Sequence, residues 1–450
     1  MKLLFLFVFS FLSSIAFTQS YPAHDPRMYD IIDAVSADRI EKDIRKLVSF
    51  GTRHTLSETV SETKGIGAAR RWIKSEFENI SNACNNCLEV KYNKGLIKKG
   101  DNRRITKDVW VVNVMAIKRG TRYPDKYIIM SGDIDSRVSD PNDFTSDSPG
   151  ANDNASGMAG VMEAARVLSK YEFPVSILFV GLSGEEQGLY GGKILAADAK
   201  EQGWDIIGVL NNDMIGNIEG VDGVKDNTSF RVFSEPHPPK INEQQQTWNR
   251  FYGGEVDGPS RQLARYVDKM TDQYMTNLDA VMIYRLDRFG RGGHHRPFND
   301  EGFPGVRIME THENYNRQHQ DIRVEDGIEY GDVIEGVDFD YAAKLTAVNA
   351  ICLAGIAWSP PAPELVMIGG AVQPSTRLKW DPVEDPDVLG YKVYWRDTTA
   401  PQWQYSRFVE STDVTLENII IDNYLFGVST INSSGNESVV TYPKTLIPRR

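Results

Sequence analysis

Continuous apolar runs of strand length recur along the chain as far as residue 309. Five stand out: VWVVNVMAI (109–117), YIIM (127–130), VSILFVGL (175–182), IIGVL (206–210) and VRIM (306–309). Because polar residues do not alternate with apolar ones in these runs, they predict strands buried on both faces. Apolar residues at helical spacing over 158–168, and a long apolar stretch over 338–358, predict helices that cover them. We therefore expect an α/β fold, a three-layer α/β/α sandwich around a mixed, mostly parallel sheet.

The N-terminal segment has the pattern of an export signal. MKLLFLFVFSFLSSIAFTQS (1–20) places one lysine before an apolar stretch from Leu3 to Leu12, and small polar residues follow. That stretch is too short to span a bilayer, so it predicts a signal peptide over 1–19 rather than a membrane anchor. No later segment approaches spanning length in this interpretation. We expect a secreted or periplasmic protein without a transmembrane segment after cleavage.

The cysteines fit an oxidising compartment. Cys84 and Cys87, in CNNC, can close a small loop as a disulfide, and Cys352 lies in an apolar helical stretch where a core residue is expected. A single CxxC pair without a second one is weak evidence for a zinc or redox site.

The chain changes character after the predicted helix over 338–358. SPPAP (359–363) ends that helix and predicts a stiff linker. Short alternating strands separated by Pro, Gly, Asp and Asn follow over 364–450 and predict a small β-sandwich. The chain is thus expected to hold a larger α/β domain over 20–358 and a second, smaller domain.

The C-terminal part resembles a fibronectin type III module. The resemblance implies that Trp380 and Tyr391 lie in its core and that Tyr424 takes the place of the corner tyrosine. Contact with a surface or a polymer is the role we expect for such a module.

Acidic residues gather where the predicted strands end. The formal net charge of -12 argues against a nucleic-acid partner, because phosphate binding needs a concentrated excess of Lys and Arg. The residues at strand ends, or on the loop PGANDNASG (149–157), are Asp133, Asp135, Asp153, Glu185, Glu186 and Asp213, and His319 follows the last run. Carboxyl ends of parallel strands share one rim of a sheet. Six carboxylates cannot converge there without cations, which predicts a site for two divalent metal ions that share one carboxylate.

The spacing of these acids separates their roles. Asp133 and Asp135 are two apart in an extended segment, so both can point to one side. Glu185 and Glu186 are neighbours and must point apart. One glutamate can therefore bind metal while the other faces a metal-activated water.

Five motifs in order resemble those of the bacterial co-catalytic zinc aminopeptidases, a secreted metallopeptidase family. They are GDIDS, PGANDNASG, SGEEQGLYG, NNDMIG and RGGHHRPFNDEGFPGVRIMETHENYNRQHQD. Glutaminyl cyclases and transferrin-receptor ectodomains share the fold of this family. The resemblance covers about Ser36 to Trp358, so it implies that residues 20–358 form a metallopeptidase domain that acts on peptides.

The resemblance also implies a role for each site residue. Asp153 matches the carboxylate that bridges both ions, Glu186 and His319 match ligands of one ion, and Asp213 matches a ligand of the other. Glu185 matches the general base that takes a proton from a water activated by the ions. His295 matches a histidine that lines the substrate site. Hydrolysis of the amino-terminal peptide bond is the usual activity.

Two positions depart from the family's pattern. The first metal ligand of the family is a histidine, and here Asp133 stands in its place, which leaves a set of four carboxylates and one imidazole. Such a set can bind Zn²⁺, but its many carboxylates favour harder ions such as Mn²⁺ more than the family's usual ligands do. Asp135 matches a residue that supports the replaced histidine. His294 stands where the family has an acid, so we expect Asp133 and His294 to touch if the acid and the histidine have exchanged places.

Two other functions remain open on the sequence. A glutaminyl cyclase on this fold uses one zinc, and loss of a histidine ligand at Asp133 is compatible with it. A binding or adhesion protein with an inactive core is the second alternative. Retention of Glu185 beside Glu186 and Asp213 favours the hydrolase, because an inactive site needs no general base.

Overall fold

The computed structural model describes residues 24–254 and 257–448. The predicted signal peptide over 1–19 lies outside the described residues. One central sheet carries eight strands in the order β1-β2-β4-β3-β5-β8-β6-β7. Their bounds are β1 (Leu88–Ile97), β2 (Val109–Lys118), β3 (Tyr123–Asp133), β4 (Val175–Leu182), β5 (Asp205–Asn212), β6 (Ser229–Ser234), β7 (Asp279–Ile283) and β8 (Gly305–Glu310). The five predicted apolar runs form β2, β3, β4, β5 and β8.

The strands at the centre of the sheet run parallel. β4, β3, β5 and β8 pair in parallel with one another, whereas β1 with β2, β2 with β4, and β6 with β8 pair antiparallel. The sheet is therefore mixed, as the sequence predicts. Because the four parallel strands end at the same rim, the acids that follow them are brought together.

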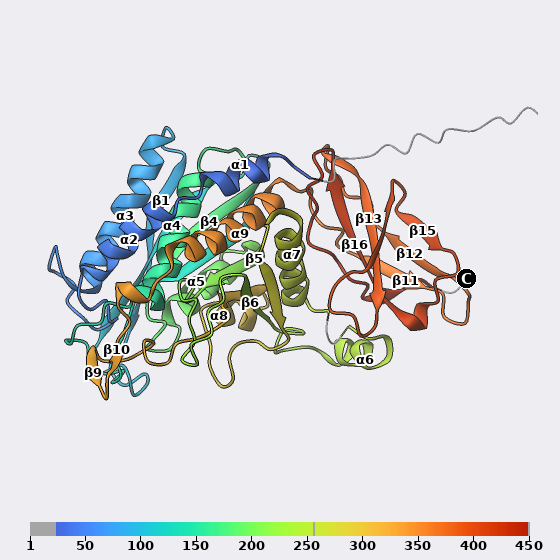
Figure 1. Cartoon of the computed structure of the whole chain (residues 1–450). Helices are drawn as coiled ribbons and strands as arrows, with labels where there is room; N and C mark the ends of the chain where they lie inside the picture. The colour runs from blue at the N-terminus through green and yellow to red at the C-terminus, as the bar shows by residue number, and fades with distance from the viewer. Residues whose placement is uncertain (1–23, 255–256, 449–450) are drawn as a thin grey trace, which may run out of the picture.

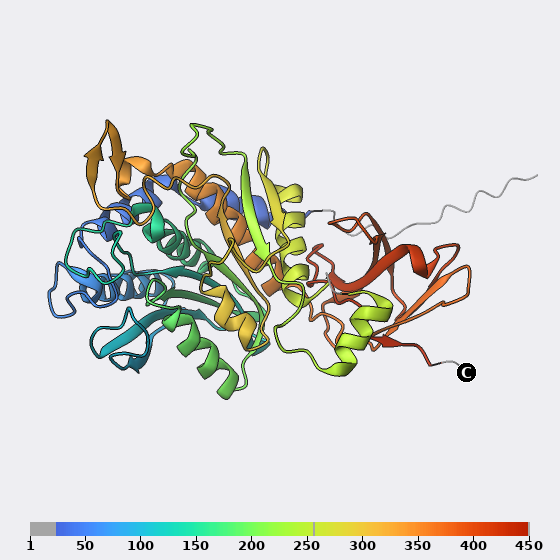
Figure 2. The ribbon, with the colours of Figure 1, turned by 90° about the horizontal axis from the view of Figure 1, so that it is seen from below.

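Helices cover both faces of this sheet, which confirms the expected α/β fold (Figures 1 and 2). One face carries α1 (Arg27–Ala34), α2 (Ala37–Val48), α3 (Gly65–Ala83), α4 (Gly157–Leu168), α7 (Pro259–Tyr274) and α9 (Phe339–Trp358), which share one large apolar core with it. The opposite face carries α5 (Tyr190–Glu201) and α8 (His295–Asp300) over a smaller core.

Helix α9 corrects one expectation. By length and composition it could cross a membrane, contrary to the interpretation that no later segment approaches spanning length. In the folded chain 89% of its most apolar window is buried, against α4, α1, α2 and α7. Its apolar character is that of a core helix.

The C-terminal strands form two further sheets around a separate apolar cluster. One sheet has the order β15-β12-β11-β17 and the other β14-β13-β16. The bounds are β11 (Val366–Gly369), β12 (Thr376–Trp380), β13 (Val388–Asp397), β14 (Tyr405–Val409), β15 (Asp413–Leu416), β16 (Tyr424–Asn432) and β17 (Thr445–Leu446). Trp380 and Tyr391 are buried and pack edge to face, with ring centroids 5.2 Å apart, and Tyr424 is partly buried. The fibronectin type III resemblance stays a prediction.

The predicted linker is held against its surroundings. Thr430 Oγ1 donates to the carbonyls of Pro360 (3.1 Å) and Pro361 (2.9 Å), and Asn432 Nδ2 donates to that of Trp358 (3.1 Å). α6 (Glu243–Tyr252) adds Trp248 to the C-terminal apolar cluster. The C-terminal sheets are thus docked on the larger part of the chain.

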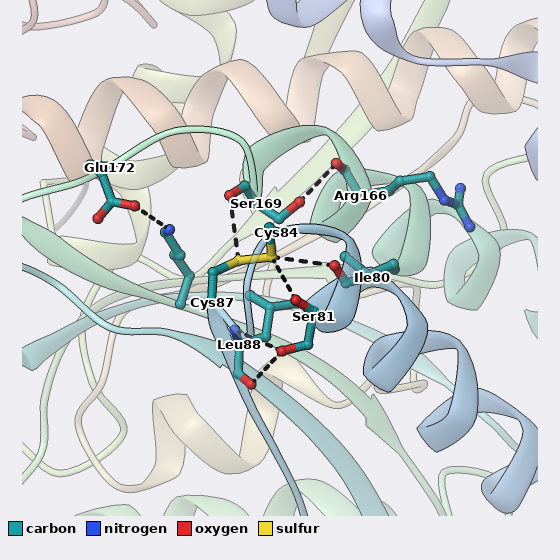
Figure 3. The surroundings of a disulfide bond; sticks show 9 residues. Ile80, Ser81, Cys84, Cys87, Leu88, Arg166, Ser169 and Glu172 are labelled. Carbon is teal, nitrogen blue, oxygen red and sulfur yellow. Dashed lines mark hydrogen bonds and ion pairs between the residues drawn. A yellow bond between two sulfur atoms is a disulfide. The ribbon is translucent and has the colours of Figure 1, made fainter.

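Cys84 and Cys87, which the sequence left as a possible pair, form a disulfide that closes the turn between α3 and β1 (Figure 3). Within the same turn Ser81 Oγ donates to the carbonyl of Leu88 at 2.9 Å. Cys352 is buried in α9, as expected.

Candidate metal centre and catalytic cavity

A cavity of about 620 Å³ opens at the rim where the parallel strands end. Of the eight predicted site residues, five line it: Asp153, Glu185, Glu186, Asp213 and His319. The other three, Asp133, Asp135 and His295, are buried and do not line it. Arginine and lysine side chains form much of the remaining wall: Arg103, Arg104, Arg137, Lys193, Arg288, Arg291 and Arg296.

Asp153, Glu186 and His319 form a compact group of possible metal ligands. One ligand atom from each lies within 4.8 Å of the others. His319 Nε2 is 2.9 Å from Asp153 Oδ2 and 2.9 Å from Glu186 Oε1. Burial alone would lower the pKa of His319, but the two carboxylates raise it to about 9. Two carboxylate oxygens and one imidazole nitrogen are a donor set that Zn²⁺ accepts, so these residues fit a bound ion.

The loop that carries Asp153 is fixed by residues from distant parts of the chain. The backbone N–H groups of Asn152 and Asp153 donate to Asp332 Oδ1 (2.8 Å) and Oδ2 (2.7 Å). Arg53 Nη2 donates to the carbonyl of Gly150 at 2.9 Å. Gly150 has a φ of +50°, and a Cβ there would lie 2.5 Å from the carbonyl oxygen of Asp153. The glycine-rich sequence therefore lets the loop turn tightly enough to aim one carboxylate at the rim.

Asp135 holds the turn that carries both glutamates. Its Oδ1 accepts a hydrogen bond from the backbone N–H of Glu185 (3.2 Å), and its Oδ2 accepts one from that of Glu186 (3.1 Å). On the other side of Glu186, Arg137 Nε donates to Oε2 at 2.7 Å, while Oε1 faces His319. Asp135 thus supports the backbone of the two glutamates. From the sequence we expected it to support the side chain at position 133 instead.

Glu185 has the surroundings of a proton acceptor. It lines the cavity and is partly exposed. Burial, together with the negative charges of Glu186 and Asp213, raises its pKa well above the usual value. A carboxylate with a raised proton affinity, beside the ligand group, is suited to general-base catalysis.

Asp133 and His294 touch, as the exchange hypothesis requires. His294 Nδ1 is 2.5 Å from Asp133 Oδ1, and Asn154 Nδ2 donates to Oδ2 at 2.9 Å. Burial lowers the pKa of His294 to about 4 and raises that of Asp133. Both oxygens of Asp133 are therefore engaged by protein groups.

Arg307, which the sequence interpretation did not assign, reaches the same rim. It lies on β8 opposite Asn211 of β5, and its side chain is fully buried. Nη2 is 2.9 Å from Asp213 Oδ2, and Nη1 is 3.0 Å from Asp287 Oδ1. Burial raises the pKa of Asp213 to about 8 against the opposing charge of Arg307. A lone cation in a run predicted to be buried on both faces was the available signal, because buried charges need partners.

His295 does not lie where the sequence predicted. It is fully buried, and its Nε2 donates to the carbonyl of Leu286 at 2.7 Å, with Asp287 Oδ2 3.7 Å away. It stands behind the cavity wall, where it supports the segment that carries Asp287 and Arg288. In this position His295 does not reach the cavity where a substrate would bind.

Comparisons with known proteins agree with this geometry. A family model described as "Peptidase family M28" matches residues 113–331, which include every predicted site residue. A "Probable zinc metalloprotease" of Pyrenophora tritici-repentis is 40% identical over 422 residues, which are 93% of this chain and 87% of that protein. One of Leptosphaeria maculans is 40% identical over 424 residues, 94% of this chain and 98% of that protein. Both relatives are fungal, whereas the motifs resemble those of bacterial enzymes.

Solved structures share the fold at low sequence identity. The Legionella pneumophila LapA aminopeptidase matches with a TM-score of 0.51 and 20% identity, covering 79% of this chain and 80% of that one. An aminopeptidase from Aneurinibacillus sp. strain AM-1 matches with a TM-score of 0.50 and 13% identity, covering 74% and 96%. These structures show the shared fold, and the family model together with the relatives at 40% identity shows that the chain belongs to peptidase family M28 and is a zinc metallopeptidase.

Proposed function

We propose that this protein is an aminopeptidase that hydrolyses the amino-terminal peptide bond of peptides, with Glu185 as its general base. The observation that carries the proposal is the place of Glu185, which lines the cavity beside the ligand group of Asp153, Glu186 and His319. Two solved structures that share the fold are aminopeptidases, which supports the choice of that activity within the family.

The residues of the chain divide the chemistry among them. Asp153, Glu186 and His319 would hold the ion, and a zinc ion there supplies a Lewis acid that lowers the pKa of water and polarises a carbonyl. Glu185 takes the proton from the attacking water and passes it to the leaving amine. Asp135 keeps Glu185 and Glu186 in place by accepting hydrogen bonds from both backbone N–H groups.

Hydrolysis of aminoacyl p-nitroanilides and short peptides tests this function, with the cleaved end identified by mass spectrometry. We expect loss of single residues from the amino terminus, which stops on chelation and returns with zinc. Glu185→Gln should lower kcat by roughly 10²–10⁴-fold, because it removes the base. Glu201→Gln, at the exposed end of α5, is the matched control.

The other outcomes separate the alternatives. Cyclisation of amino-terminal glutamine without peptide cleavage would identify a glutaminyl cyclase. A zinc-loaded protein that turns over no aminoacyl, peptidyl or glutaminyl substrate would be a binding protein. Cleavage from the carboxyl end would keep the peptidase and reject the aminopeptidase.

We also propose that the chain is exported and meets its peptides outside the cytoplasm, and that its C-terminal sheets contact a surface or polymer. The Cys84–Cys87 disulfide supports export, because disulfides persist in oxidising compartments. Protein recovered from the culture medium should begin near residue 20, and retention inside the cell would contradict export. Removal of residues 364–450 should abolish binding to the producing cells or to insoluble polymers; unchanged binding would reject that role.

A further inference from the structure

The residues predicted to bind a second ion are engaged by the protein itself. Asp133 lies between His294 and Asn154, and Asp213 Oδ2 is paired with Arg307 at 2.9 Å. Among the described residues, two groups of acids and histidines bring three ligand atoms within 4.8 Å of one another. One is the group at the rim described above, and the other is Asp268, Asp272 and Asp279 on α7 and β7; neither includes Asp133 or Asp213. Of these two acids, only Asp213 Oδ1 is left without a protein partner, and one free oxygen falls short of the three or four ligands that a zinc ion needs.

Arg307 brings a fixed positive charge to the carboxylates that would surround the second ion. Its charge acts on Asp133, Asp153 and Asp213, the three acids that the sequence assigned to that ion. Arg307 Nη1 donates hydrogen bonds to both carboxylate oxygens of Asp287, at 3.0 and 3.1 Å. Asp287 is itself shared with Arg288, whose Nε is 3.5 Å from Oδ1. Asp287 thus holds one nitrogen of the Arg307 guanidinium, and the other nitrogen points toward Asp213.

One divalent ion balances the charge of the predicted ligands and of the two arginines paired with them. Four carboxylates converge on the rim: Asp133, Asp153, Glu186 and Asp213. A guanidinium stays protonated in proteins, so Arg307 beside Asp213 and Arg137 beside Glu186 contribute two positive charges. One divalent ion supplies the other two. A second ion would lie against Arg307, and the repulsion between them would oppose its binding.

We propose that this centre binds one divalent ion, at Asp153, Glu186 and His319, and that the guanidinium of Arg307 takes the place of the second. Arg307 is a positioning residue: it does not line the cavity, but it fixes Asp213, which does. The inference deepens the proposed function and rests on it for the catalytic role of the ion. The ion count itself requires no substrate.

Titration of the metal-free, full-length protein with zinc chloride, followed by calorimetry and native mass spectrometry, tests the count. We expect one ion per chain at this centre. His319→Ala should lower the zinc affinity by at least about tenfold, because it removes a ligand, whereas Asp213→Asn should leave the count at one ion per chain. A second ion that is lost in Asp213→Asn would overturn the proposal. A second ion that persists in Asp213→Asn binds elsewhere and leaves one at this centre.

Variants at position 307 test the role of the guanidinium. Arg307→Met should release Asp213 and raise the count to two, whereas Arg307→Lys keeps the charge and should keep one ion. A folded Arg307→Met protein that still takes one ion would overturn the exchange. If Arg307→Met does not fold, the comparison of the wild type with Asp213→Asn decides. A protein that binds one ion at this centre but cleaves no peptide would reject the proposed function alone. An active peptidase with two ions, one of which is lost in Asp213→Asn, would reject this inference alone.

Discussion

Lys269 of α7 and Glu437 of the C-terminal region form an ion pair that joins the two parts of the chain, with Nζ 2.9 Å from Oε2. Lys392 Nζ lies 3.1 Å from the other carboxylate oxygen, and the Glu437 side chain is only 7% exposed. Figure 1 shows α7 beside the C-terminal strands. The C-terminal sheets are thus held by two partly exposed lysines around the buried carboxylate of Glu437, in addition to apolar contacts.

The first prediction concerns the pH dependence of this junction. Burial alone would raise the pKa of Glu437, but Lys269 and Lys392 lower it to about 2, below the usual value of 4.5. Because the folded-state pKa is depressed, the carboxylate stabilises the fold above pH 4.5, and this contribution is lost as the pH falls from 4.5 toward 2. Glu437→Gln should cost about 3 kcal/mol at pH 7, and less at pH 3, since it leaves Lys269 and Lys392 without their partner.

Urea unfolding at pH 7 and pH 3 measures this difference. Asp413→Asn is the control, because it removes an exposed pair with Arg377 and should cost less than about 1 kcal/mol. An equal loss for Glu437→Gln at both pH values would show that packing, not charge, explains the effect.

The second prediction concerns Asp135. Asp135→Asn leaves one oxygen for the two backbone N–H groups of Glu185 and Glu186 that the carboxylate now accepts. We expect kcat to fall about 10–100-fold, as for other residues that support a metal ligand, with KM within about twofold. Steady-state kinetics with one zinc ion per chain checked by mass spectrometry separates this role from simple unfolding. A change confined to KM would place Asp135 in substrate binding instead.

Much of the fold could be predicted because buried parallel strands have a simple pattern. β4 coincides with the predicted run over 175–182, since all eight of its residues are buried. β1 was not predicted: it is an edge strand whose buried and exposed residues alternate irregularly with lysines and an asparagine. Apolar runs identify the centre of a sheet better than its edges.

The site divides in the same way. Asp153, Glu186 and His319 could be found because they stand in motifs at strand ends. The roles of Arg307 and Asp332 could not, because they depend on partners about 90 to 180 residues away; for Arg307 the sequence signals only that a buried cation needs a partner. Only the folded chain shows that Asp332 fixes the Asp153 loop and that Arg307 pairs with Asp213.

The third prediction concerns substrate charge. Apart from the acids at the metal centre and Asp300, which lies beside Arg296, the cavity wall is mainly cationic, with Arg103, Lys193, Arg291 and Arg296 exposed. We expect peptides with a carboxylate next to the scissile bond to have a kcat/KM at least about tenfold above neutral ones, and this advantage to shrink as salt screens the charges. Arg291→Gln should reduce kcat/KM for acidic substrates and leave it unchanged for leucyl substrates. A preference for neutral substrates at low salt would contradict this.

The last prediction concerns Gly150, which lets the metal-binding loop turn. An added Cβ would lie 2.5 Å from the carbonyl oxygen of Asp153 and 2.5 Å from the Cβ of Ser136, so Gly150→Ala should displace the loop that carries Asp153. Gly203→Ala is a matched control, because Gly203 also has a positive φ, +69°, but open space around its Cβ position. Both variants carry the strain of alanine at positive φ, about 1 kcal/mol. Only Gly150→Ala should lower zinc affinity, by about tenfold or more, since a displaced ligand is lost to the ion. Zinc titration of both variants measures this difference. Equal zinc affinities would mean that the turn at Gly150 does not position Asp153 against Glu186 and His319.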